Sequence, residues 1–174
     1  MTSWPREAAP TGRDSESGPL DRGWQLELFE DREKHLLETL AMRLRKAADP
    51  EADAFSVFND AQDHVLSTAR AHVDRVVLEA FVSAVDECTD SDARAVLDQV
   101  CDLYALSTIE ADKGWYLEHG RVTPARSKQV TAAVNDLCAV LRPRAQELVD
   151  AFAIPQSWLG TELLEEPARA FAEA

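Results

Sequence analysis

The chain has 174 residues, of which 45% are apolar and 29% are charged, and its formal net charge is −14 at pH 7. This size and composition are typical of one soluble folded domain, and the strong acidity excludes a nucleic-acid-binding surface, which needs a basic footprint. Ala, Leu, Glu and Arg dominate while glycine occurs only six times, which favours an all-α fold.

Several sequence features bear on where the protein resides. The N-terminal residues contain no signal-peptide apolar run, and no stretch approaches the length of about 18 residues that a membrane span needs. The C-terminal RAFAEA lacks a Ser-Lys-Leu peroxisomal signal. The three cysteines, Cys88, Cys101 and Cys138, are far apart and are predicted to be buried, reduced thiols. We therefore expect a cytoplasmic protein that does not bind a membrane.

The chain is predicted to begin with a disordered leader over residues 1–20, which are rich in Pro, Gly, Ser and charge. The helical domain is predicted over 21–166 and a short tail over 167–174. A first amphipathic helix is expected from about Trp24 to Ala47, ahead of the turn at Asp49-Pro50. Its apolar positions recur at mainly three- and four-residue spacing: Leu26, Phe29, Leu36, Leu37, Leu40 and Leu44.

A second, longer helix is predicted from about Asp53 to Cys88, and Ala69 and Ala80 are small enough to let a neighbour approach closely. Its apolar stripe is nearly continuous: Phe55, Phe58, Val65, Ala69, Val73, Val76, Val77, Ala80, Phe81 and Ala84.

A third helix is predicted with Ser91 as its N-cap and an end near Lys113-Gly114. Its buried positions are expected to be Val96, Leu97, Val100, Cys101, Tyr104 and Ile109, widened by Leu103 and Leu106.

The N-cap and proline at Thr123-Pro124 predict a fourth helix that runs to Phe152 with a kink at Pro143. Its inward positions are expected to be Val130, Val134, Leu137, Leu141, Leu148, Val149 and Phe152. A last partial helix is expected around Trp158, Leu159, Leu163 and Leu164. Together these elements predict an all-α, mostly antiparallel bundle of about four long helices.

Known site chemistries find little support in the sequence. A di-iron bundle needs two Glu-x-x-His motifs, but His35 precedes Glu38, Asp60 lies four residues before His64, and His72 has no such partner. There is no G-x-S-x-G motif and no Gly-rich phosphate loop. We predict no catalytic, cofactor-binding or metal-binding residue.

Two groups of residues near the predicted corner between the third and fourth helices are candidate sites. Glu110 and Asp112 could have raised pKa values there, but an ion pair with Lys113 or Arg121 is the favoured interpretation. The aromatic corner at 115–117 could be a ligand platform, but is better interpreted as a packing element.

The order of several motifs carries a resemblance to a known family. These motifs are AHVDRVVLEAF (71–81), LYALSTIEADKGWYLEHGRVTPARSKQV (103–130), LRPRAQELVDAF (141–152) and an opening FEDREKHLLETLAMRL (29–44). Over about residues 24–164 the sequence resembles the C-terminal helical domain of the flavin-dependent acyl-CoA oxidases. The resemblance implies the reaction of acyl-CoA with O2 to give trans-2-enoyl-CoA and H2O2 in fatty-acid β-oxidation, with FAD as cofactor.

The family's Gly-rich flavin segment, its catalytic glutamate and its β-domain have no counterpart in this sequence. The resemblance therefore implies a domain that packs on, and helps to dimerise, a catalytic core of the acyl-CoA dehydrogenase/oxidase type from the same or a neighbouring gene, without FAD bound by this chain alone. Two alternatives remain open: an autonomous helical interaction module that has no enzymatic activity and forms a homodimer, and an enzyme in its own right.

Overall fold

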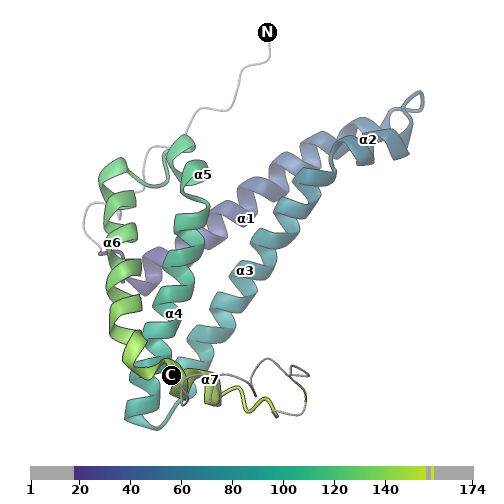
Figure 1. The fold of residues 1–174 in the computed structure, drawn as a ribbon. Helices are drawn as coiled ribbons and strands as arrows, with labels where there is room; N and C mark the ends of the chain where they lie inside the picture. Colours follow the sequence, from purple (N-terminus) through teal and green to yellow (C-terminus); the bar gives the residue numbers. More distant parts are fainter. Residues whose placement is uncertain (1–17, 156–157, 159–174) are drawn as a thin grey trace, which may run out of the picture. The chain divides into compact units, whose positions relative to one another are not determined.

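A computed structural model describes residues 18–155 and 158 of the chain, and the regular elements of this part are all helices, as predicted. The chain divides into two compact units, residues 1–140 and 141–174. The long helices of the described part are α1 (Arg22–Leu44), α3 (Gln62–Glu87), α4 (Ser91–Ala111) and α6 (Pro124–Leu141) (Figure 1). Shorter elements are α2 (Ala54–Asp60), α5 (Lys113–Glu118), α7 (Ala145–Asp150) and the 3₁₀ turns Arg45–Ala48 and Arg142–Arg144.

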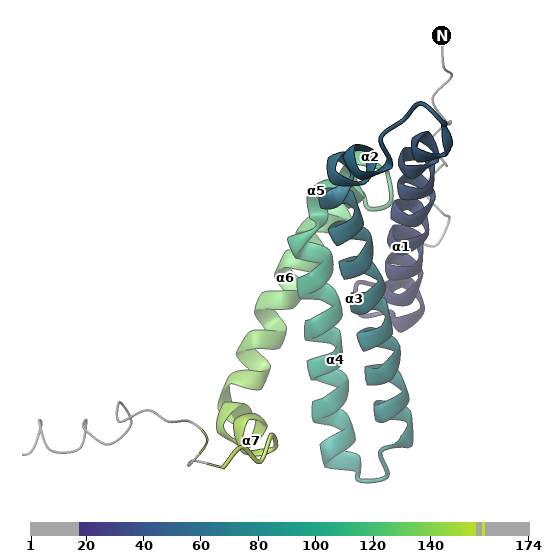
Figure 2. The same ribbon diagram turned by 90° about the vertical axis from the view of Figure 1, so that its right-hand side faces the viewer.

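In the first unit, α3 packs against both α1 and α4, and successive long helices run in opposite directions (Figures 1 and 2). The core is one apolar cluster to which α1, α3, α4, α5 and α6 all contribute. Leu78 of α3, Leu106 of α4 and Tyr116 of α5 are among its largest fully buried side chains. The apolar positions predicted for the third helix are confirmed, because all of them are buried or half-buried.

Capping side chains fix where the helices begin. Asp21 accepts a hydrogen bond from the Trp24 N–H at 2.7 Å, and Thr123 accepts one from the Arg126 N–H, which confirms the predicted start of α6. The N-cap of α4 is Asp90, whose carboxylate accepts from two backbone N–H groups, rather than the predicted Ser91.

A glycine at positive φ ends α5. Gly120 has φ 62°, its N–H bonds to the Leu117 carbonyl, and the Arg121 N–H bonds to the Tyr116 carbonyl. This is the Schellman pattern, in which the residue after the helix takes the left-handed conformation that favours glycine. It returns the chain toward α6.

The predicted helix from Asp53 to Cys88 is interrupted at Ala61, which ends α2 with φ −102° and ψ 1°. The two residues before it, Asn59 and Asp60, are poor helix formers whose short polar side chains compete for backbone groups. The hydrophobic stripe continues across this break, so periodicity alone predicted one helix where there are two.

Pro143 interrupts the predicted fourth helix instead of kinking it. The α-helix ends at Leu141, residues 142–144 form a 3₁₀ turn, and α7 follows within the second unit. Proline cannot donate the backbone hydrogen bond that a continuous α-helix requires at its position. Within this unit Arg144 pairs with Glu147 at 2.7 Å.

Several burial predictions were wrong. Leu37 is 55% exposed on α1, while Val149 and Phe152 in the second unit are 64% and 76% exposed. Cys101 is buried as predicted, but Cys88 is half-buried and Cys138 exposed, since its neighbour Leu137 takes the inward position on α6. The predicted tail, 167–174, lies outside the described residues, as do most of the predicted leader and Leu159, Leu163 and Leu164 of the predicted last partial helix. Trp158 is exposed.

The largest correction concerns α3. Its inner face, which contacts the core, consists of Thr68, Ala71, Leu78 and Val85. Most of the predicted stripe lies on the opposite side of the helix, and we call this the outer face: Leu66, Ala69, Val73, Val76, Val77, Ala80 and Ala84.

Candidate functional site

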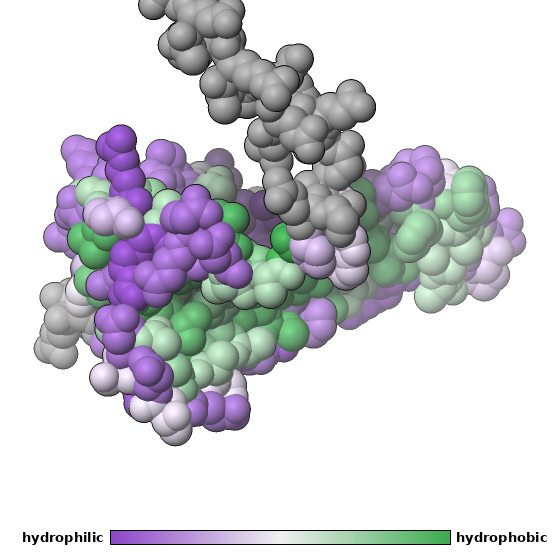
Figure 3. Space-filling view, turned by 60° about the horizontal axis from the view of Figure 1, so that its bottom comes forward, coloured by the Kyte–Doolittle hydropathy of each residue, from purple (hydrophilic) through white to green (hydrophobic). Residues whose placement is uncertain are grey.

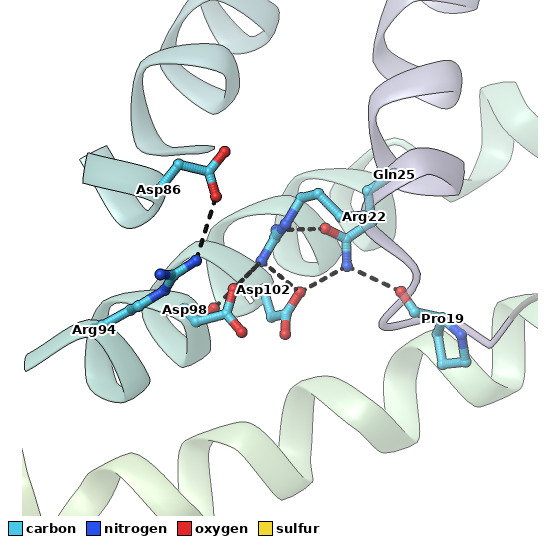
Figure 4. A network of polar contacts seen from close by, with 7 residues as sticks. All are labelled: Pro19, Arg22, Gln25, Asp86, Arg94, Asp98 and Asp102. Carbon is cyan, nitrogen blue, oxygen red and sulfur yellow. Dashed lines mark hydrogen bonds and ion pairs between the residues drawn. The ribbon is translucent and has the colours of Figure 1, made fainter. Parts of the chain in front are cut away.

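A polar network joins the start of α1 to α4 (Figure 4). The Arg22 guanidinium donates to Asp98 at 2.9 Å and to the Gln25 amide oxygen at 2.6 Å, and it lies 3.0 Å from an Asp102 carboxylate oxygen. The Gln25 amide nitrogen donates to Asp102 and to the Pro19 carbonyl, each at 3.0 Å. Gln25 is fully buried, so the network fixes the position of α1 against α4.

Burial raises the pKa of Asp102, against the hydrogen bond from Gln25 and the positive charge of Arg22, which both lower it. A carboxylate that is desolvated but hydrogen-bonded and paired with a cation is typical of a structural network as well as of a reactive site. Since every polar partner of Asp102 belongs to the network, we interpret it as structural.

A cavity of about 460 Å³ opens beside this network. Its charged lining includes Arg22 and Arg94, faced by Asp86 and Asp98, and Arg94 pairs with Asp86 at 3.5 Å. The charges of the lining therefore largely neutralise one another.

The predicted aromatic corner lies against α1. Trp115 stacks on His119 with ring centroids 4.4 Å apart, and His35 of α1 meets both rings edge-on. The Arg32 guanidinium lies 5.8 Å from the Trp115 ring centre. Tyr116 is buried whereas Leu117 is 37% exposed, so the corner packs the core through Tyr116 and faces solvent through Leu117.

The acidic residues near this corner have structural partners. Asp112 pairs with Arg32 at 2.5 Å, and Glu110 accepts a hydrogen bond from the Thr131 hydroxyl at 2.6 Å. The predicted partner Arg121 pairs instead with Asp31. The prediction of ion pairing is correct for Asp112, but its partner comes from α1, which no local pattern indicates.

Each histidine that could be considered a metal ligand has a structural partner of its own. His64 lies 2.7 Å from the Thr39 hydroxyl, His72 pairs with Glu33, and His35 belongs to the aromatic corner. Within residues 18–155 and 158, no three His, Cys, Asp or Glu side chains are arranged to hold a metal ion. Nor is any helix of that part long and apolar enough to cross a membrane.

Exposed apolar surface is the most distinctive property of the first unit. On the outer face of α3, Leu66 is 68% and Val73 55% exposed, and on α2 Phe55 is 75% exposed beside Phe58. Figure 3 shows apolar surface on the arm at its right, the end that carries α2. Exposed apolar surface is a common feature of interaction sites. The fold and its surfaces thus define an all-helical domain with exposed apolar side chains on α2 and α3.

Comparison with known proteins identifies the family. The acyl-CoA oxidase family model matches residues 22–163. Acyl-coenzyme A oxidase 2, peroxisomal, of Arabidopsis thaliana is 37% identical over 135 residues, which are 78% of this chain and 19% of that protein. An acyl-coenzyme A oxidase-like protein of Mus musculus is 36% identical over 125 residues, 71% of this chain and 20% of that protein. The chain belongs to the acyl-CoA oxidase family.

Solved structures agree with this assignment. Acyl-CoA oxidase 3 of Yarrowia lipolytica superposes with a TM-score of 0.73 at 22% identity, covering 85% of this chain and 21% of that one. Acyl-CoA oxidase 1 of Arabidopsis thaliana gives a TM-score of 0.71 at 23% identity, covering 84% and 22%. The fold is therefore that of a helical domain of acyl-CoA oxidases, and the chain spans about a fifth of the length of these relatives.

The family is FAD-dependent in general, so we compared the cavity beside Arg22 with the needs of a flavin. A flavin ring system requires a largely apolar slot, and its pyrophosphate requires unpaired donors. The cavity instead presents Asp86 and Asp98, and its arginines are already paired with these carboxylates. The lining of this cavity therefore does not fit FAD.

Proposed function

We propose that this chain is the C-terminal α-domain of a flavin-dependent acyl-CoA oxidase, and that it packs with and helps to dimerise a catalytic core outside the chain. The complete enzyme would convert acyl-CoA and O2 to trans-2-enoyl-CoA and H2O2 in fatty-acid β-oxidation. The supporting observation is the match over residues 22–163 to a family whose members are about five times longer than the matched segment.

In this proposal the chemistry belongs to the core. FAD bound by that core would supply the redox chemistry, by which two hydrogens removed from the acyl chain would reach O2 and form peroxide. This chain contributes a rigid helical scaffold, held by the Leu78–Leu106–Tyr116 core and the Arg22 network. Its part in the enzyme is to position and stabilise the core.

We also propose that the protein works in the cytoplasm, although relatives are named as peroxisomal proteins. The three cysteines, Cys88, Cys101 and Cys138, are all free thiols, which suits a reducing compartment. Fluorescence microscopy or fractionation of the native host checks this expectation, and a protein recovered in a membrane-bounded compartment would contradict it.

The reconstitution experiment tests the proposed function directly. The purified chain is mixed with the flavin-containing acyl-CoA oxidase core protein of the same organism, and complex formation is measured by size-exclusion chromatography at micromolar concentration. Peroxide release on adding straight-chain acyl-CoA thioesters is measured in parallel. We expect a complex with higher or more durable peroxide release than the core alone. If the two proteins elute separately at these concentrations, the proposal is wrong.

A second candidate is an autonomous interaction module without enzymatic activity, which the exposed outer face of α3 also supports. Such a module would form a homodimer through its apolar surfaces. Light scattering distinguishes the interaction module from the oxidase domain. A dimer that does not bind the core favours the module, whereas a monomer that binds the core favours the oxidase domain.

A further inference from the structure

Resting on the proposed function, we propose that the outer face of α3 is the docking surface for a helix of the oxidase core, and that α2 extends the same interface. The outer face is the row Leu66, Ala69, Val73, Val76, Val77, Ala80 and Ala84 defined above. The domain would thus bind through this apolar row, and the element that binds it would be an α-helix of the core.

The spacing of the outer face fits a helical partner. Leu66, Ala69, Val73, Val76 and Ala80 are separated by three, four, three and four residues, the repeat with which one helix packs along another. The alanines allow a short distance between the two helix axes. A helix is therefore the partner element that this row accommodates best.

The charges around the outer face resemble those of an interface. Residues of the row are all apolar, while Arg70 lies beside it on one flank and His72 and Glu79 on the other. Arg70 pairs weakly with Asp74 at 3.8 Å, and Glu79 pairs with Arg75. A centre without charge inside a charged rim is the usual anatomy of a protein interface.

The area of the row argues for a partner larger than one matching helix. From Leu66 to Ala84 the face is ~27 Å long and about 10 Å wide, or roughly 300 Å². A stable interface buries about 800 Å² on each partner. The outer face needs a neighbouring surface to reach that area, and the exposed Phe55 and Phe58 of α2 provide one.

Charge disfavours a second copy of this chain as the occupant of the outer face, and the length of the relatives favours the core. Two copies would bring net charges of −14 and −14 together, and this repulsion opposes self-association. By contrast, about four-fifths of the length of the relatives lies outside the matched segment. A polypeptide of that size supplies both a helix for the outer face and additional surface for α2.

The test compares two valines that are equally exposed, Val73 on the outer face and Val140 on α6, each at 55%. Val73→Asp and Val140→Asp are titrated against the flavin-containing core protein by calorimetry, and circular dichroism with thermal unfolding checks that both variants fold. We expect Val73→Asp to weaken binding by about tenfold or more, because it buries a carboxylate in an apolar contact, while Val140→Asp binds like the wild type. Val76→Gln repeats the measurement with an uncharged helix former.

Each outcome decides a different point. If the wild type binds the core and Val73→Asp and Val76→Gln bind it equally well, the proposed docking surface is wrong but the proposed function stands. Wild type that does not bind the core contradicts the proposed function itself and removes the basis of this inference. A wild-type dimer that Val73→Asp converts to a monomer shows that a second copy occupies the face, and overturns the core as its partner.

Discussion

The two faces of α3 carry similar residues but have different surroundings. The inner face places Leu78, at 0% exposed, and Val85, at 7%, against α1 and α4. The outer face presents Leu66 and Val73 to solvent over the same helix. Burial inside the domain explains why the inner residues are apolar, whereas within residues 18–140 the outer ones have no such burial. This contrast is the pattern expected of a central helix that has a neighbour on both sides.

The largest expected effect is the difference between two leucines of α3. Leu78→Ala removes buried methyl groups and leaves a cavity, which should lower the free energy of unfolding by about 2–5 kcal/mol. Leu66→Ala, at 68% exposed, should change it by less than about 0.5 kcal/mol. Urea unfolding followed by circular dichroism measures both. Equal losses in the two variants would mean that the outer face is also buried in the isolated chain.

Periodicity predicted that α3 is apolar, but it did not predict which side is buried. An apolar residue appears on almost every side of this helix, and the stripe containing Val73 and Val76 is more continuous than the one containing Thr68 and Ala71. A continuous stripe marks a contact without saying whether the neighbour lies in the same chain. The buried positions of α4, including the widening at Leu103 and Leu106, were predicted correctly, because its apolar residues contact neighbours of the same unit.

The polar contacts were harder to predict than the helices. The long helices, the Thr123 cap and the family were evident from local pattern and ordered motifs. The partners Arg22 and Asp102 are far apart in sequence, as are Arg32 and Asp112, and only the packing of α1 brings each pair together. Sequence spacing carries no information on such pairs until the tertiary contacts are known.

A smaller effect is expected at the edge between the two faces. Glu33 of α1 accepts hydrogen bonds from Arg75 and His72 of α3, and these lower its pKa although burial raises it. Glu33→Gln should lower the free energy of unfolding by about 1 kcal/mol, since this carboxylate is largely shielded from water. Glu79→Gln removes the more exposed partner of Arg75, and its cost should be no more than about 0.5 kcal/mol.

Thermal and urea unfolding at low and high salt check this pair of variants. The cost of Glu33→Gln should shrink only slightly in high salt, whereas the cost of Glu79→Gln should nearly vanish, because salt screens exposed charges more strongly. A larger loss for Glu79→Gln than for Glu33→Gln would contradict the assignment of Arg75 to the inner side of α3.

The smallest expected effect is a dependence of folding stability on pH that docking should not share to the same extent. Burial lowers the pKa of His35 below its ordinary value of 6.5, aided by the nearby positive charges of His119, Arg121 and His64 and opposed by Glu38. Below pH 6.5 the unfolded chain therefore binds more protons at this site than the folded chain, so stability falls as the pH drops through that window. The outer face of α3 itself contains no titratable side chain, and His72 lies only on its rim, where it pairs with Glu33. Docking through this face should therefore respond less to the same change.

Unfolding measured between pH 8 and pH 5.5 tests this distinction, with His35→Gln as the comparison. The variant should be somewhat less stable at pH 8, because it loses contacts with Trp115 and His119, but its stability should fall less on acidification than that of the wild type. An equal fall in both would exclude His35 as the source of the pH dependence. If affinity for the core instead falls in parallel with the protonation of His35, docking involves the α1–α5 corner as well as α3.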